Sequence, residues 1–121
     1  MTAFKAPLRD MRFAMHEVLT TTAHYQSLGR DDLTAEIIDA VLEEGAKFNE
    51  GVVAPLNRSG DEEGIVFKDG EIKTPEGFID AYQQFCDNGW ASMTSSEDFG
   101  GQGLPLSLAA PFQEMMMAAN I

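Results

Sequence analysis

The chain has 121 residues and a formal net charge of −12, from eight lysine and arginine residues against twenty aspartate and glutamate residues. A chain this acidic repels phosphate backbones and shows no basic stripe, so we expect no nucleic acid partner. Cys86 is the only cysteine, which excludes an internal disulfide and favours a cytoplasmic location. No apolar run approaches the ~20 residues of a membrane span, and charged residues interrupt the first nineteen, so we expect neither a membrane partner nor a secretory signal.

Two helices are predicted in the first half of the chain. The first begins at Pro7, whose missing N–H costs nothing at a first helical position, and apolar residues at helical spacing continue it to about Thr22. A break follows over residues 29–32. The second helix is predicted over residues 33–54, with a wide apolar face, and Pro55 ends it.

The middle of the chain shows turn signals. Residues 57–64 have the polar, glycine-bearing character of a loop. Two short arms then flank Asp69-Gly70, a pair favoured in tight hairpin turns. Because two such arms are marginally stable alone, a β-hairpin and an extended surface excursion are alternatives of equal weight.

A third helix is predicted to begin at Thr74-Pro75-Glu76, which combines a hydroxyl cap, a proline at the first position and an acid in the first turn. Its buried stripe consists of Phe78, Ala81, Tyr82 and Phe85. Gly89 is the expected stop.

A fourth helix follows a loop over residues 91–105 and begins at about Leu106 or Ser107. Pro111 must lie in its first turns or kink it. The apolar pattern continues to Ile121 without a terminating signal, which indicates truncation in mid-helix. The predicted fold class is therefore all-α, with about four helices and at most one short β-hairpin near Asp69-Gly70.

Residues suited to catalysis or metal binding are few. His16 and His24 are eight positions apart and Cys86 has no adjacent base, so we interpret all three as ordinary helix residues. The acidic residues 61–63 lack the alternating ligands of a calcium loop. No G-x-S-x-G turn exists for a serine nucleophile. The residues thus predict no metal site and no catalytic centre in this chain.

The glycine cluster of residues 100–103 begins like a dinucleotide fingerprint, yet Leu106 replaces the third glycine and no convincing strand precedes it. We interpret it as a flexible approach to a helix, in which glycine supplies positive φ angles. A phosphate-binding turn is the less favoured alternative.

Several motifs occur in a fixed order along the chain. They are Gly89-Trp90, the run Ser96-Glu97-Asp98-Phe99-Gly100-Gly101-Gln102-Gly103-Leu104, and Gln113-Glu114-Met115. Together they resemble the N-terminal domain of the acyl-CoA dehydrogenases. Ser96 stands where that family usually carries proline, and Asp98 replaces a glutamate.

Further segments resemble one branch of the family, which includes the methylmercaptopropionyl-CoA dehydrogenases and many bacterial relatives. These segments are residues 5–13, 16–19, 54–61 and 74–78. The resemblance implies an extra N-terminal segment over residues 1–30 and an N-terminal helical domain over residues 31–121, truncated at Ile121.

The resemblance implies an oxidoreductase several times longer, with a middle β domain and a C-terminal helical bundle. Such a flavoprotein uses FAD to remove two hydrogens from an acyl-CoA thioester, as in fatty acid metabolism. A glutamate takes the α proton, the β hydrogen leaves as hydride to the flavin, and the electrons pass to an electron-transfer flavoprotein. The base and most flavin and CoA contacts lie outside these residues, so we expect this fragment to be inactive alone, and we expect a homo-oligomer.

The resemblance also places part of the chain beside the acyl pocket. The residues concerned are Phe99, Gly101, Met115, Met116, Asn120 and Ile121. Methionine adapts to irregular shapes and suits a pliable wall. Plain packing between helices remains the favoured interpretation for most of this stripe.

A rival hypothesis from another class is a non-enzymatic, acidic helical module for protein–protein interaction. In that hypothesis, Phe112 and the methionine cluster form a groove for a partner helix. A small standalone acyl-CoA binder is disfavoured, because the chain lacks a basic surface for phosphate. As an isolated piece the chain should expose apolar faces and self-associate.

Overall fold

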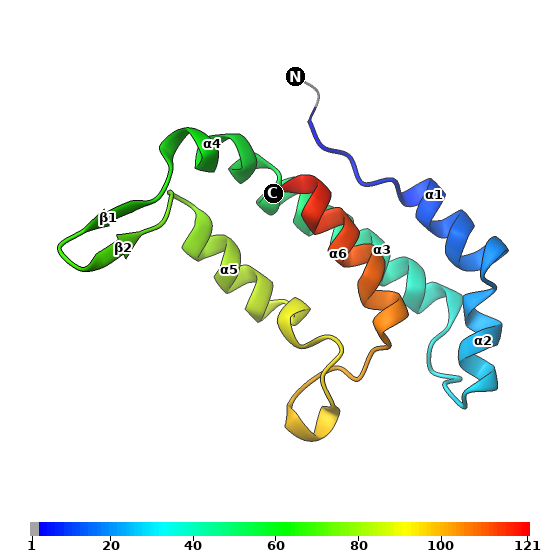
Figure 1. The fold of residues 1–121 in the computed structure, drawn as a ribbon. Coiled ribbons are helices and arrows are strands. Elements are labelled where there is room, and N and C mark those ends of the chain that lie inside the picture. The colour runs from blue at the N-terminus through cyan, green and yellow to red at the C-terminus, as the bar shows by residue number, and fades with distance from the viewer. Residues whose placement is uncertain (1–2) are drawn as a thin grey trace.

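The computed structural model describes residues 3–121, and it is helical with one short antiparallel hairpin (Figure 1). The elements are α1 (Leu8–Arg12), α2 (Thr21–Ser27), α3 (Ala35–Phe48), α4 (Pro55–Glu63), β1 (Val66–Lys68), β2 (Glu71–Lys73), α5 (Phe78–Asp87) and α6 (Leu106–Ala119). π-Helical turns over Phe13–Val18 and Asn49–Val53 extend α1 and α3. The predicted fold class is confirmed.

α3 and α6 pack against each other in the centre of the molecule (Figure 1). The helices α1 and α2 lie on one side of this pair, and α5 lies on the other. The hairpin projects from the end where α4 leads into α5. The loop that joins α5 to α6 returns at the opposite end, and it contains the glycine cluster.

The hydrophobic core lies where α1 and α2 meet α3 and α6. Its buried residues are Met11, Met15, Tyr25, Leu33, Ile38, Leu42, Ala46, Leu108 and Met115. A second cluster continues toward α5 and contains Phe48, Met93, Ala109 and Phe112. Residues before and after the predicted boundary at residue 30 belong to this first core. The two predicted segments therefore share one hydrophobic core.

The first predicted helix is divided, because the chain turns at Thr20. This residue has a left-handed conformation with φ 45°, which is uncommon for a β-branched side chain. α2 begins at the next residue and ends at Ser27, followed by Gly29 with φ 77°. The break predicted over residues 29–32 is confirmed, and the extent of the first helix was wrong.

The loop predicted over residues 57–64 was also wrong, because α4 occupies most of it. Pro55 does not simply end the preceding helix; it occupies the first position of α4, where a proline N–H is not needed. An ion pair between Arg58 and Glu62, four residues apart with N–O 2.7 Å, supports the exposed face. The glycine within this helix, Gly60, is buried.

Of the two alternatives for residues 65–74, the β-hairpin is confirmed and the extended surface excursion is not. Asp69 and Gly70 both have positive φ, 53° and 83°, as a tight turn between twisted strands requires. Phe67 pairs with Ile72 across the two strands. All six strand residues are exposed to solvent.

α5 begins three residues after the predicted start, and Thr74 does not cap it. The reason is a turn in which the Phe78 N–H donates to the Pro75 carbonyl at 3.3 Å. The Glu76 N–H donates to the Glu63 carboxylate at the end of α4 (2.9 Å), so that side chain takes the place of a local cap. The end of the helix was predicted correctly, since Gly89 follows it with φ 79°.

α6 begins at Leu106 as predicted and contains Pro111 within its first two turns. The helix ends at Ala119, whereas the apolar pattern predicted continuation to Ile121. Asn120 has an extended conformation, and its side-chain amide donates to the Val53 carbonyl at 3.3 Å.

Candidate functional site

The glycine-rich loop uses its backbone donors within itself. The N–H groups of Gly101, Gln102 and Gly103 donate to the carbonyls of Ser96, Ser92 and Ser95 at 3.0, 3.1 and 2.9 Å. A phosphate-binding turn needs such N–H groups free and directed at the ligand. The arrangement therefore does not suit a phosphate. The cluster leads into α6, and its glycines supply positive φ angles as expected, but its backbone is tied by internal hydrogen bonds and is not the flexible approach that we predicted.

The glycines of this loop are required for two different reasons. Gly100 and Gly103 have positive φ, 82° and 62°, as expected. Gly101 does not, but a Cβ there would lie 2.1 Å from the Ser95 carbonyl oxygen. The backbone thus passes too closely for any side chain at this position.

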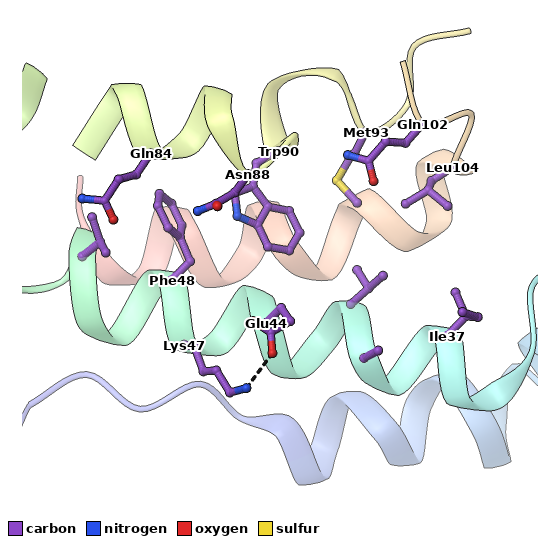
Figure 2. A pocket seen from close by; sticks show the side chains of 13 residues that line it. Ile37, Glu44, Lys47, Phe48, Gln84, Asn88, Trp90, Met93, Gln102 and Leu104 are labelled. Carbon is purple, nitrogen blue, oxygen red and sulfur yellow. Dashed lines mark hydrogen bonds and ion pairs between the residues drawn. The ribbon is translucent and has the colours of Figure 1, made fainter. Parts of the chain in front are cut away.

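A cleft of about 510 Å³ lies between α3 and the segment that runs from α5 to the glycine-rich loop (Figure 2). Its lining residues are Ile37, Ala40, Val41, Glu44, Lys47, Phe48, Val52, Gln84, Asn88, Trp90, Met93, Gln102 and Leu104. The walls are largely apolar, and Gln84, Asn88 and Gln102 contribute amide groups. Lys47, the one cation in this lining, pairs with Glu44 at 2.5 Å, and that contact raises the Lys47 pKa. The lining described here therefore suits no phosphate group.

An aromatic cluster adjoins this cleft, and two of its rings, Phe48 and Trp90, line it. The rings of Trp90 and Phe112 stack with centroids 4.2 Å apart and planes 8° apart. Phe48 and Phe85 each lie about 6 Å from Phe112, at 6.3 and 6.2 Å. The indole Nε1 of Trp90 is buried without a hydrogen-bond partner among the described residues. Stacked rings of this kind give the region a fixed shape.

A smaller apolar groove of about 260 Å³ lies between α4, α5 and the end of α6. Its lining residues are Phe48, Val53, Leu56, Phe78, Ala81, Tyr82, Phe85, Met116 and Asn120. Asn120 provides the single polar side chain apart from the Tyr82 hydroxyl. The Cys86 thiol beside Tyr82 raises the pKa of this phenol. The groove thus suits an apolar chain rather than a charged ligand.

The structure brings together two of the six residues that the family resemblance placed near an acyl pocket. Met116 and Asn120 line the apolar groove. Phe99 and Gly101 lie in the loop before α6, separated from the groove by a 14-residue helix that is about 21 Å long. Phe99 is 90% exposed, and Ile121 is also exposed.

Met115 and Phe112 do not line an open surface. Met115 is fully buried in the first core, and Phe112 is 2% exposed within the aromatic cluster. In the rival hypothesis, Phe112 and the methionine cluster form a groove for a partner helix; of these residues, Met116 lines the apolar groove and Met117 is exposed, whereas Phe112 and Met115 belong to the interior.

The sequence did not indicate that α5 forms one wall of the groove. Its stripe of Phe78, Ala81, Tyr82 and Phe85 was predicted to be buried, yet α5 contains no fully buried residue. Tyr82 is 68% exposed. The helical spacing was the right signal for one shared face, but spacing alone does not distinguish a core from an open groove.

Charged side chains form a cluster between α1 and α3. His16 Nε2 lies 2.8 Å from Asp39 Oδ1, and Arg12 pairs with both Asp39 and Glu43. The hydrogen bond from His16 is the main cause of a lowered Asp39 pKa, with a further contribution from Arg12. These contacts hold the first helical segment on α3.

Nothing in residues 3–121 is arranged as a metal centre, since no three histidine, cysteine, aspartate or glutamate side chains gather to hold an ion. Over the same residues, no helix combines the length and apolar character needed to cross a membrane.

Comparison with known proteins gives one informative similarity. No protein-family model matches the chain. A curated relative, the 3-methylmercaptopropionyl-CoA dehydrogenase of Ruegeria pomeroyi, is 33% identical over 123 aligned residues. The alignment covers 98% of this chain and 20% of the relative, so the chain spans about one fifth of that protein's length. The resemblance to an acyl-CoA dehydrogenase is thereby confirmed over nearly the whole chain.

Proposed function

Because nearly the whole chain is similar to one fifth of an acyl-CoA dehydrogenase, we propose that it is the N-terminal helical part of a FAD-dependent enzyme of this kind. The complete protein would oxidise the α,β bond of an acyl-CoA thioester and pass electrons to an electron-transfer flavoprotein. We propose a cytoplasmic homo-oligomer, in which residues 1–30 are the extra segment of the branch and residues 31–121 the helical domain. The 33% identity is the observation that carries this proposal.

Two sets of groups in this chain that could contact a flavin pyrophosphate already have partners. The N–H groups of residues 101–103 are already bonded within the loop, and Lys47 in the cleft is paired with Glu44. A flavin pyrophosphate needs donors or cations of this kind. The flavin contacts and the catalytic base therefore belong, in this proposal, to segments beyond this chain.

The apolar groove is the part of this chain that we assign to the acyl group. It is smaller than the about 300–1,000 Å³ of an ordinary small-molecule pocket, so other segments would complete it. Met116 provides a pliable wall and Asn120 a polar edge. Phe99, Gly101, Met115 and Ile121 would then act indirectly, through the placement of α6.

The first test is to read the coding sequence downstream of Ile121 and to express the whole frame. The proposal expects a yellow protein with flavin absorbance that acyl-CoA thioesters bleach. A panel that includes straight-chain and methylthio-substituted thioesters would identify the substrate, and residues 1–121 alone serve as the inactive control. A flavin-free product, or a flavoprotein that no thioester reduces, would contradict the proposal.

The assignment of the groove has its own test in that enzyme. Met116→Trp fills part of the groove and should raise KM for long acyl chains more than for short ones, by about tenfold, the cost of roughly 1.4 kcal/mol of lost binding. Met117→Trp is the matched control, because Met117 is exposed on the neighbouring position of α6. Equal effects of the two variants would exclude Met116 from the acyl site.

A further inference from the structure

The end of α2 contacts the segment that joins the glycine-rich loop to α6, through pairs of residues that lie 73 and 82 positions apart along the chain. The Arg30 guanidinium donates from Nη1 to the Gly103 carbonyl at 3.0 Å. One turn earlier, the Tyr25 hydroxyl lies 2.7 Å from Ser107 Oγ in the first turn of α6. These two contacts hold both ends of residues 103–107.

Local geometry fixes the position of Arg30. Gly29 has φ 77°, and the Arg30 N–H donates to the Tyr25 carbonyl at 2.9 Å, as in the turn that commonly closes a helix. Asp32 then accepts two hydrogen bonds from the guanidinium, from Nε and Nη2, each at 2.9 Å. Such a two-point contact orients a planar guanidinium strongly, and here it directs the remaining Nη1 at the loop.

The segment between the two contacts is also held from inside. The Leu104 N–H donates to the Met93 carbonyl at 2.8 Å, and its side chain packs against both cores. Tyr25 is 2% exposed, so its hydroxyl has little freedom to find another partner. The start of α6 therefore has one position relative to α2.

We propose that Arg30 and Tyr25 are positioning residues, which fix the exit of the glycine-rich loop and thereby the placement of α6. We call the contacts of Arg30 with Gly103 and of Tyr25 with Ser107 the brace. In the complete enzyme, and resting on the function proposed above, the brace sets the position of Met116 and Asn120 in the acyl groove. The N-terminal segment thus influences substrate binding without touching the substrate. Arg30 makes the larger contribution to this positioning, because it contacts the glycine-rich loop itself.

The brace can be tested in the 121-residue chain by amide hydrogen exchange. Arg30→Gln should speed exchange of the Gly101, Gln102 and Gly103 amides about fivefold, the factor expected for one lost hydrogen bond worth about 1 kcal/mol. Arg30→Lys keeps a cation but not the two-point contact, so it should restore part of the protection. Arg58→Gln is the matched control, since it removes an arginine–carboxylate pair on α4 that does not involve the loop.

Two results would overturn the brace. One is loop exchange in Arg30→Gln equal to that in Arg58→Gln. The other is an equal acceleration in α5, which would show that Arg30 stabilises the whole fold rather than the loop. Tyr25→Phe provides a second variant that keeps the buried ring, and it should speed exchange in the first turn of α6.

The link to the acyl group is measured in the complete enzyme. Arg30→Gln should raise KM for the acyl-CoA thioester about fivefold with little change in kcat, because the reacting groups are held by other segments. An unchanged KM overturns the link to the acyl site. If the wild-type protein oxidises no thioester, the proposed function fails instead, and the exchange measurements still decide whether Arg30 braces the loop.

Discussion

Gly100 and Gly101 are adjacent, yet substitution by alanine should affect them differently. Gly101→Ala would place a Cβ 2.1 Å from the Ser95 carbonyl oxygen, so the backbone must move, at a cost of about 2–3 kcal/mol. Gly100→Ala meets no atom within 4 Å and bears only the strain of φ 82°, about 1 kcal/mol. Urea denaturation measures both free energies of unfolding. Equal losses would show that the close approach at Gly101 is not the reason for this glycine.

Asp39 should make stability depend on pH in the acidic range. Its pKa in the folded protein lies below the ordinary 3.8 because His16 and Arg12 hold the carboxylate. The unfolded chain therefore takes up this proton first as pH falls. The stabilisation is complete above ~pH 5 and is lost as pH falls through the folded-state pKa.

Asp39→Asn is the variant that measures this contribution. Because the side chain is 39% exposed, we expect a loss of only about 1 kcal/mol at pH 7. The difference from wild type should shrink as pH falls through the folded-state pKa of Asp39, which lies below its ordinary value. Asp31→Asn, at an exposed carboxylate between α2 and α3, is the control. A difference that persists at the lowest pH would mean that Asp39 acts through packing and not through its charge.

At the scale of elements, the aromatic cluster joins α3, α5 and α6. Phe112→Ala removes the ring that stacks on Trp90 and should cost about 3–5 kcal/mol. Phe99→Ala is a matched control, because that ring is 90% exposed, and its effect should stay within about 0.5 kcal/mol. Should Phe112→Ala not fold, Phe112→Leu reports the same contact through the emission of Trp90, the only tryptophan. Similar losses at Phe112 and Phe99 would contradict the packing described.

The elements that the sequence predicted best are those whose signals are local. The helices α3 and α6 have long apolar stripes, and the turn of the hairpin has the Asp69-Gly70 pair that tight turns favour. α4 was missed because its residues are polar and include Gly60, which normally weakens a helix. The structure supplies the reason, since a Cβ at Gly60 would lie 2.6 Å from the Phe78 ring. This contact is between α4 and α5, so the local helix preference of the α4 residues could not indicate it.

The candidate site was predicted less completely than the fold. The family resemblance pointed to Met116 and Asn120, which do line a groove. The opposite wall is formed by α4 and α5. Their packing depends on Gly60 and on Gly77, which has φ 87° and where a Cβ would lie 2.8 Å from the Leu56 side chain. Burial of an apolar face cannot be read from spacing alone, so the sequence could not show that the α5 face is left open.

At the scale of the whole molecule, several large apolar residues are exposed to solvent. The hairpin carries Phe67 and Ile72, which pair across the strands and are 71% and 69% exposed. Because paired strand residues point to the same face, they form one apolar surface. Surfaces of this kind commonly mark an interface with another segment or another molecule.

The isolated chain should therefore self-associate through this hairpin, against the repulsion of its −12 charge. Added salt screens that repulsion, so the mean mass in sedimentation or light scattering should rise with ionic strength. The double variant Phe67→Thr with Ile72→Thr keeps strand-forming residues but removes the apolar surface, and it should stay monomeric at concentrations where the wild type associates. Phe99→Thr, a lone exposed ring elsewhere, should associate like the wild type. If the hairpin variant and the Phe99 variant behave alike, the association lies on another face, of which the Ile79 and Tyr82 side of α5 is the next to test.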